Sequence, residues 1–181
     1  MTRFGWAMTT YLASVAIGFS AFLDPPPALI WNASLSVPIG FFTVHPVDLL
    51  EIADLVVVAP PDDLAEFLAE RGYLPRGVPM LKRVLGLAGQ EVCRTDRIIT
   101  VDGIAMGAAL DRDSADRDLP VWRGCRVIGD GEIFLMNWQS ADSFDGRYVG
   151  PLPVTTIIDR ALPLWTDEEG DGRYEWRAPT R

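Results

Sequence analysis

The chain has very few side chains that exchange a proton near neutral pH. Its 16 basic residues include one lysine, Lys82, and the rest are arginine; the single histidine is His45. Arginine stays charged at physiological pH and cannot accept a proton, whereas a desolvated lysine can. A base for a hydroxyl nucleophile must therefore be sought at Lys82 or His45. A lone lysine in an arginine-rich chain marks a position where deprotonation matters, unless codon bias and chance left it there.

Cysteine is nearly as scarce, with Cys93 and Cys125 as the two examples. Two cysteines and one histidine without ligand spacing do not make a zinc site, so we expect no metal and no other cofactor. Disulfides persist outside the cytoplasm, which is where we place this part of the chain. A bridge would close a loop of about 30 residues and stabilise the fold by roughly 3 to 4 kcal/mol. We expect Cys93 and Cys125 to be joined.

Positive charge is in short supply overall. The 181 residues carry a net charge of -9, spread along the chain rather than gathered in one block. Phosphate binding needs a basic face, so this balance argues against a nucleic-acid partner. The length suits one domain of ordinary size with a real core.

Charge is absent altogether from Gly5 to Leu23. An apolar run of about 20 residues is long enough to cross a bilayer as a helix. Arg3 precedes the run and Asp24 follows it, so the positive-inside rule places the N-terminus in the cytoplasm and the rest of the chain outside. We expect a retained membrane anchor. The alternative is a cleavable signal peptide, with Gly18 and Ser20 as the small residues before the cut.

Beyond the anchor the pattern predicts a mainly β domain with a small helical insertion. Residues 1–27 form the anchor and a proline-rich spacer, residues 28–165 the domain, and residues 166–181 a loose polar tail. We expect the helix to be capped by Asp62 and to end at Gly72. We predict strands or strand pairs at residues 37–44, 54–59, 80–87, 98–106, 126–136 and 154–165. The turn Asp102-Gly103 makes residues 98–106 a hairpin. Pro38 and Gly40 put the first of these at a sheet edge, where an extended substrate could pair with it.

Ser34 and Ser36 supply a candidate nucleophile and a candidate second donor. In an extended segment, residues two apart point to the same side, where one substrate carbonyl could meet both hydroxyls. A histidine-based hydrolase using His45 is the weaker alternative, because His45 precedes Pro46 in an apolar turn and has no obvious acidic partner.

Lys82 lies in the otherwise apolar run Met80 to Leu87. Lowering a lysine pKa from about 10.4 to the range of about 7 to 8 that suits a base costs on the order of 4 kcal/mol, which desolvation supplies. The alternative is a lysine whose stem packs while its amine reaches water.

Three blocks, in order, resemble the signal peptidase I superfamily of serine/lysine peptidases (S26), and most closely its conjugative-transfer branch, the TraF family. They are residues 32–42, similar to the serine box; residues 81–89, similar to the lysine box; and residues 143–151, similar to the Ser-x-Asp-x-Arg box. The resemblance extends over the chain after the anchor. It implies a signal-peptidase-like β-sheet or barrel catalytic domain.

The resemblance also implies roles for individual residues. Ser36 would be the nucleophile and Lys82 the general base, while Ser34 and the Ser36 backbone N–H would stabilise the oxyanion. In the third block, Ser143 would hydrogen-bond the Lys82 amine.

By the same resemblance Asp145 and Arg147 would form a supporting ion pair; the alternative for this block is a surface turn. One departure concerns residues 136–139, Met-Asn-Trp-Gln, which replace the Gly-Asp-Asn-Arg run of leader peptidases. That departure weakens the case for a general leader peptidase more than it weakens the chemistry.

The function implied is a serine endopeptidase anchored in the bacterial inner membrane by a single pass, with its catalytic domain in the periplasm. Its substrate would be a conjugative pilin or another secreted precursor, cleaved or cyclised through an acyl-enzyme, and components of a conjugation or type IV secretion system are further expected partners. A general type I signal peptidase is one alternative. An inactive structural component of a secretion or pilus assembly is another, disfavoured because Ser36, Lys82 and Ser143 are all present.

Overall fold

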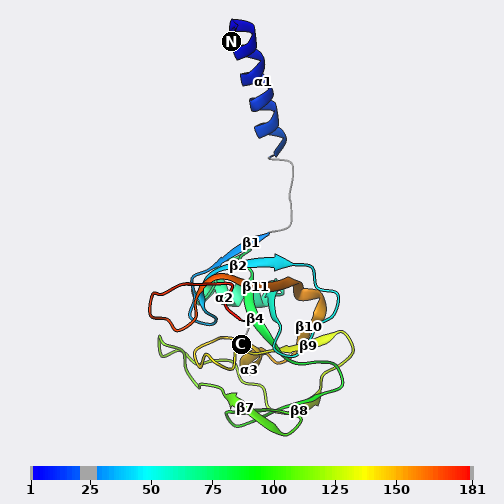
Figure 1. Ribbon diagram of the computed structural model, residues 1–181. Helices are drawn as coiled ribbons and strands as arrows, with labels where there is room; N and C mark the ends of the chain where they lie inside the picture. Colours follow the sequence, from blue (N-terminus) through cyan, green and yellow to red (C-terminus); the bar gives the residue numbers. More distant parts are fainter. Residues whose placement is uncertain (1, 21–27, 180–181) are drawn as a thin grey trace.

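The computed structural model describes residues 2–20 and 28–179. Helix α1 (Arg3–Ser20) stands apart from a β-rich body in Figure 1. In the described part of the chain, no helix combines the length and the mean hydropathy needed to cross a bilayer. The predicted span from Gly5 to Leu23 is helical as far as Ser20, and its last three residues lie outside the described ranges, as does the proline-rich spacer.

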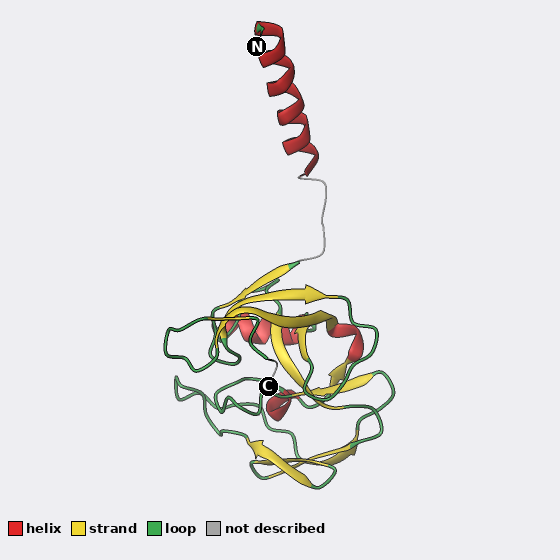
Figure 2. Ribbon diagram, viewed as in Figure 1, coloured by secondary structure: helices red, strands yellow, loops and turns green. Residues whose placement is uncertain are grey.

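The body is mainly β, as the sequence predicts, and its strands form two sheets (Figure 2). The larger sheet has the order β1-β2-β11-β3-β4-β9-β10, with β12 paired to β11; the smaller has the order β7-β6-β5-β8. The strands of the larger sheet are β1 (Leu29–Asn32), β2 (Ile39–His45), β3 (Leu55–Val58), β4 (Met80–Gly86), β9 (Glu132–Leu135), β10 (Leu152–Pro153), β11 (Ile157–Asp167) and β12 (Glu175–Trp176). Those of the smaller sheet are β5 (Glu91–Thr95), β6 (Ile98–Val101), β7 (Ile104–Ala108) and β8 (Gly124–Val127).

Strand β4 lies inside the larger sheet and is buried along most of its length, although it carries Lys82 and Arg83 among apolar residues. Six of its seven residues are buried, and it pairs with β3 on one side and β9 on the other. Its far end joins the two sheets: Leu85 packs in one core cluster with Val92 of β5 and Phe134 of β9. The strand that carries the only lysine is therefore held rigidly from both sides.

Two expectations about the strands are wrong. Strand β2 is not at an edge, because β1 pairs with one side of it and β11 with the other. Pro38 is accommodated because the strand starts after it, and Gly40, inside the strand, allows a close approach of β11, where a Cβ would overlap the Trp165 carbonyl oxygen. Residues 154–165 do not form a strand pair: a short 3-10 helix, η1 (Val154–Thr156), leads into the single strand β11, which pairs with both β2 and β3.

The expectation of a loose tail after residue 165 is also wrong for the described residues. Strand β11 runs on to Asp167, and β12 returns to pair with it through Trp165 and Trp176. Thr166, Asp167 and Ala178 are buried. Asp167 accepts hydrogen bonds from two backbone N–H groups of the following turn, so this carboxylate stabilises the turn.

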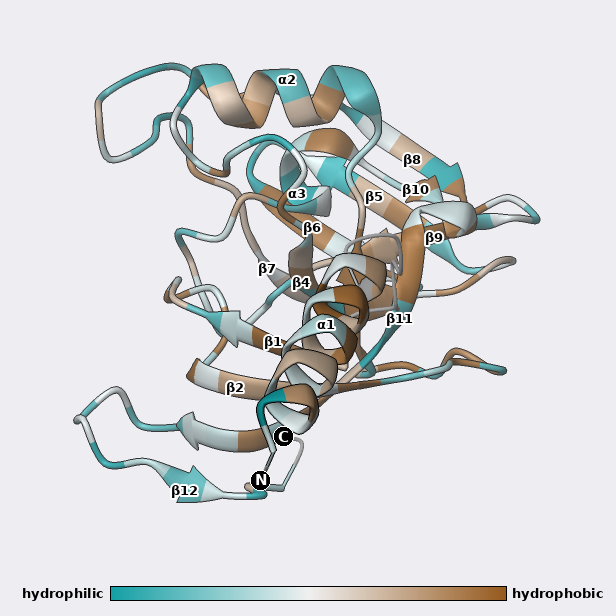
Figure 3. Ribbon diagram, turned by 90° about the horizontal axis from the view of Figure 1, so that it is seen from above, coloured by the Kyte–Doolittle hydropathy of each residue, from teal (hydrophilic) through white to brown (hydrophobic). Residues whose placement is uncertain are grey.

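The predicted helical insertion is α2 (Asp62–Glu70). Asp62 is its first helical residue rather than its cap; the preceding residue is Pro61, whose side chain makes no capping bond. Gly72 follows the helix with φ of 70°, a left-handed conformation that glycine adopts without strain and that ends helices. Leu68 is buried against the body, and Figure 3 shows hydrophilic and hydrophobic residues alternating along α2.

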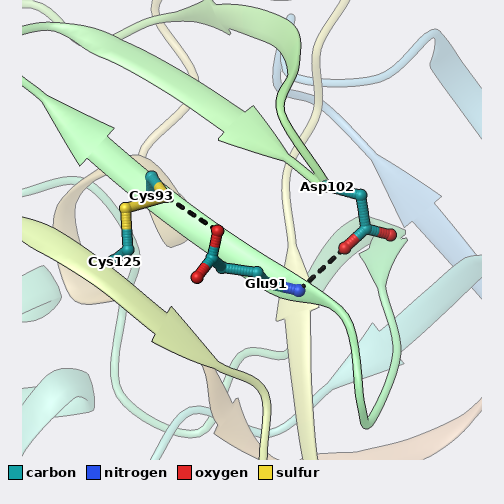
Figure 4. Close-up of a disulfide and its surroundings, with 4 residues drawn as sticks. All are labelled: Glu91, Cys93, Asp102 and Cys125. Atoms are coloured by element: carbon teal, nitrogen blue, oxygen red, sulfur yellow. Dashed lines mark hydrogen bonds between the residues drawn. A yellow bond between two sulfur atoms is a disulfide. The ribbon is translucent and has the colours of Figure 1, made fainter.

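Strands β5 and β8 are joined by a disulfide between Cys93 and Cys125, which lie directly opposite each other in the ladder (Figure 4). Glu91 Oε2 lies 3.7 Å from Cys93 Sγ, so one carboxylate and two sulfurs gather here. Because the sulfurs are bonded to each other, neither is available as a thiolate ligand.

Replacing both cysteines by alanine is expected to lower the free energy of unfolding by roughly 3 to 4 kcal/mol, since the bridge spans a sequence separation of 32 and restricts the unfolded chain. Urea titration with and without a reductant measures this. The double variant should match the reduced wild type, and peptidase activity below the unfolding transition should not change. Equal stability of the oxidised wild type and the variant would contradict the prediction.

Candidate active site

Lys82 is buried at the centre of the site. Lys82 is 6% exposed, and it is paired with Val56 of β3 in the antiparallel ladder between β3 and β4. The small pocket that it lines is otherwise formed mostly by apolar side chains from β4, β9, α2 and the loop after β9, including Met80, Leu135, Leu64 and Phe144. An ammonium group in such surroundings loses most of its hydration.

The amine has one hydrogen-bond partner in the described structure: Lys82 Nζ donates to Ser143 Oγ at 2.8 Å. Burial lowers the pKa of Lys82 from 10.5 to about 8. The negative charge of Asp145 acts in the opposite sense and raises this pKa, while the positive charge of Arg147 lowers it. A substantial share of the lysine is thus neutral at mildly alkaline pH, as a general base requires.

Ser143 is carried by a loop that the buried pair Asp145 and Arg147 organises. Arg147 Nη2 lies 2.8 Å from Asp145 Oδ2 and Arg147 Nε donates to Oδ1 at 2.9 Å, so the contact is bidentate. The same guanidinium donates to the carbonyls of Ser140, Ala141 and Ser143. This block is therefore a buried, internally bonded loop and not a surface turn.

The short helix α3 (Gly146–Val149) follows, with Asp145 as its N-cap. A side chain at Gly146 would bring a Cβ within 2.6 Å of the Leu135 carbonyl oxygen. Since a backbone oxygen of a central strand cannot move aside, only glycine lets this loop pack so closely on β9.

An unexpected contributor is Asn137, which is 2% exposed and lies two residues after the end of β9. Its Nδ2 donates to the Leu81 carbonyl at 3.1 Å, and its Oδ1 accepts from the Arg83 N–H at 2.9 Å. The two backbone groups flank Lys82. In the sequence, Asn137 stands out only as a polar residue directly after the apolar run Ile133 to Met136. The sequence does not indicate which groups its side chain hydrogen-bonds.

Ser34 and Ser36 lie in the turn between β1 and β2, so the expectation of an extended segment is wrong here. The turn nevertheless brings the two hydroxyls together, with Ser34 Oγ and Ser36 Oγ 2.9 Å apart. Asn32 holds this turn: its Oδ1 accepts from Ser34 Oγ at 2.9 Å, and its Nδ2 donates to the carbonyls of Ser34 and Val37. Because Ser34 Oγ gives its proton to Asn32, Ser36 is the donor in the serine pair.

The serine turn and the lysine strand are linked through the core. Val37, next to Ser36, packs in one cluster with Leu81, next to Lys82. Among the hydrogen bonds of the described residues, Ser36 Oγ is joined to Ser34 and Lys82 Nζ to Ser143, and none joins Ser36 to Lys82.

His45 lies at the exposed end of β2, where its Nε2 is 2.9 Å from Thr43 Oγ1. The structure gives it no carboxylate partner among the described residues, which a histidine base would need for orientation.

Helix α2 contributes to the site by packing on the loop of Ser143. Phe67 of α2 and Tyr73 beyond it lie 5.4 and 5.6 Å from Phe144, measured between ring centroids, and Phe144 stacks on Tyr148 at 5.1 Å. Phe144 separates Ser143 from Asp145 in the sequence. Helix α2 and the residues that follow it therefore cover the loop that carries Ser143, and shield the lysine amine from water.

The comparison with known proteins identifies the family of the chain. Residues 1–165 match the family model described as "Signal peptidase, peptidase S26". The chain belongs to this peptidase family.

Within the family, the similar proteins point to one branch. "Conjugal transfer protein TraF" of Agrobacterium fabrum (strain C58 / ATCC 33970) is 35% identical over 147 residues, and "Plasmid transfer protein TraF" of Escherichia coli is 31% identical over 144 residues; each alignment covers 75% of this chain and 81% of the relative. "Probable signal peptidase I-1" of Synechocystis sp. (strain ATCC 27184 / PCC 6803 / Kazusa) is 31% identical over 112 residues, covering 62% of this chain and 53% of that protein.

A solved signal peptidase I from Enterococcus faecalis V583 is 15% identical, with a TM-score of 0.38, covering 63% of this chain and 97% of that one. With a TM-score below 0.5, this likeness adds nothing to the family assignment.

Proposed function

We propose that the chain is a serine endopeptidase in which Ser36 is the nucleophile and Lys82 the general base, and that it processes a conjugative pilin precursor. The observation that carries the proposal is the lysine amine, which is buried, bonded to Ser143 and has a pKa lowered to about 8. Burial of the only lysine in the chain is costly unless the neutral amine is used.

The proposed reaction begins when neutral Lys82 takes the proton of Ser36 Oγ as that oxygen bonds to the substrate carbonyl carbon. The oxyanion is stabilised by the Ser36 backbone N–H and by Ser34 Oγ, which exchanges its bond to Asn32 for one to the substrate. The peptide C–N bond then breaks, and the leaving amine takes the proton from Lys82. An ester between Ser36 and the acyl part remains.

Two nucleophiles can release the ester. Water, deprotonated by Lys82, gives a carboxylic acid and the free serine, which is cleavage. The N-terminal amine of the same acyl chain gives a new peptide bond, which is cyclisation. Neither route needs a metal or a cofactor.

The pilin assignment is supported by the two TraF relatives, whose names associate them with plasmid transfer and conjugal transfer. The relative named as a probable signal peptidase I favours the second candidate, a general type I signal peptidase acting on secreted precursors.

We further propose that α1 holds the protein at the bacterial inner membrane, with the catalytic domain in the periplasm. Its one charged residue is Arg3 at the first position, and most of its large apolar side chains are exposed, among them Phe4, Trp6, Leu12, Ile17 and Phe19. The Cys93–Cys125 disulfide supports an oxidising compartment. Retention of the full chain in the membrane pellet after alkaline carbonate washing tests this; release would overturn it.

The substrate is tested by co-expressing the chain with a candidate conjugative pilin precursor and measuring the intact mass of the pilin. A product that lacks its leader and is lighter by one further water supports cyclisation. A linear product lacking its leader, together with cleavage of unrelated secreted precursors, favours the general signal peptidase. An unchanged pilin, under conditions where the folded enzyme is present in the membrane, contradicts the pilin assignment.

Replacing Ser34 by alanine is expected to lower kcat by roughly 10² to 10³ with little change in KM, because the lost hydroxyl acts on the oxyanion and not on the ground state. Steady-state kinetics on a peptide spanning the cleavage site measure this. Ser114→Ala, which removes an exposed serine of another loop, is the matched control and should retain full activity. A Ser34→Ala enzyme with wild-type kcat would assign Ser34 a structural role.

A further inference from the structure

We propose that Asn137 is a positioning residue for Lys82. Its side-chain amide takes the place of a peptide group in the hydrogen bonding along the edge of β4. The main chain after β9 can therefore leave the sheet and bring Ser143 back to the lysine amine. The inference rests on the proposed Ser36/Lys82 function and assigns it a further residue.

The evidence starts with the ladder between β9 and β4. Leu135 pairs with Val84 in this ladder, and the Met136 N–H donates to the Arg83 carbonyl at 2.9 Å. One residue further, the side chain of Asn137 replaces the main chain. It accepts from the Arg83 N–H and donates to the Leu81 carbonyl.

The spacing of these two groups explains the match. In an antiparallel ladder, the N–H of one residue and the C=O of the residue two before it point to the same neighbouring strand. An amide side chain has one acceptor oxygen and one donor nitrogen, like a peptide unit, and can satisfy both. Lys82 lies between the two bonded residues, so the amide fixes the backbone on each side of the lysine.

The backbone of Asn137 is bonded to the other half of the site. Its N–H donates to Asp145 Oδ2 at 3.0 Å, and its carbonyl accepts from Arg147 Nη2 at 3.4 Å. Asn137 thus connects the two halves of the site. Its side chain is hydrogen-bonded to β4, which carries Lys82, and its main chain is hydrogen-bonded to the loop that carries Ser143. The distance between Lys82 Nζ and Ser143 Oγ depends on both connections.

Other side chains cannot reproduce this arrangement. Aspartate has no donor for the Leu81 carbonyl, serine is too short to reach both groups, and alanine leaves a buried N–H and a buried C=O unpaired. Asn137 is 2% exposed, so water does not replace a lost partner without opening the site.

The single lysine makes the test direct. In the full chain in detergent micelles, labelling lysine with ¹³C at the ε carbon gives one protein resonance, that of Lys82, whose titration reports its pKa without any assay of activity. We expect about 8 for the wild type. Asn137→Ala should raise the value to about 9 or higher, because the amine loses its fixed place beside Ser143 and gains water. Asp145 and Arg147, the charged groups that act on this amine, are retained in the variant.

The pH dependence of kcat/KM is the second readout. In Asn137→Ala the acid limb should move with the Lys82 pKa, so the loss at pH 7 is about tenfold or more and shrinks toward pH 10. Gln139→Ala, which removes an exposed amide two residues away, is the matched control and should leave both readouts unchanged. Asn137→Ser, which retains one of the two bonds, should give an intermediate value and serves if the alanine variant does not fold.

A variant at Asn137 that is less stable to heat but has the wild-type Lys82 titration and pH profile would overturn the proposal, since its role would then be purely structural. Failure of the proposed function looks different. A wild type that forms no acyl-Ser36 refutes the peptidase mechanism, while the resonance of Lys82 still decides whether Asn137 controls the lysine.

Discussion

Replacing Lys82 by methionine is expected to lower kcat/KM on the order of 10⁴-fold, the upper end of what a general base contributes. Methionine fills the space of the lysine stem but has no group that accepts a proton. The wild-type rate should rise with pH through about 8, because only the neutral amine can take the Ser36 proton. The residual activity of Lys82→Met should lack this rise. Stopped assays of peptide cleavage between pH 6 and 10 measure both effects.

The same substitution is expected to leave the protein at least as stable at pH 7. The pKa of Lys82 is lowered from 10.5 in an exposed lysine to about 8 in the fold, so the unfolded chain binds more protons between these values and stability rises with pH across this window. Below pH 8 the fold carries the full cost of a buried ammonium, about 3 kcal/mol. Methionine removes that cost and loses one hydrogen bond to Ser143.

Thermal unfolding of Lys82→Met at pH 7 therefore separates the loss of chemistry from a loss of fold. Lys82→Arg is the companion variant, because it retains the positive charge but cannot release it near neutral pH. It should be as inactive as the methionine variant. Cleavage at a near-wild-type rate by either variant would remove the lysine from the mechanism.

The resemblance to the serine/lysine peptidases predicted the hydrogen bond between Lys82 and Ser143 and the ion pair between Asp145 and Arg147, and the structure contains both. The Ser-x-Asp-x-Arg box sets Asp145 two residues before Arg147, and the short helix that follows allows the carboxylate to cap the helix and bind the guanidinium at once. An apolar strand around the only lysine predicted its burial. Short apolar runs likewise predicted β3 and β4, and the turn signal Asp102-Gly103 predicted the β6–β7 hairpin.

The parts that could not be predicted depend on pairing between distant segments. Asn137 meets Arg83 and Leu81, more than fifty residues away, and an asparagine in a sequence gives no sign of its partner. The interior place of β2 depends on β11 at the other end of the chain. The serine turn was misread as extended because the bonds that close it come from the side chain of Asn32, and side-chain bonds leave no periodic pattern.

Replacing Ser36 by alanine is expected to lower kcat on the order of 10⁶-fold, the cost of removing a nucleophile outright. The change removes one hydroxyl from an exposed turn. The remaining bonds of that turn, from Asn32 to Ser34 and Val37, do not involve it, so the fold should be unaffected. The precursor should stay at its full mass during co-expression, and no acyl group should be found on the enzyme.

Ser36→Cys sharpens this test, because a thiol is a better nucleophile than a hydroxyl. With Lys82 present, the cysteine enzyme should accumulate an acyl group on residue 36, and with Lys82→Met in the same chain it should not. Mass analysis of the peptide containing residue 36 locates the group. Precursor processing that persists in Ser36→Ala would show that Ser36 is not the nucleophile. An acyl group found on Ser34 would assign that role to Ser34.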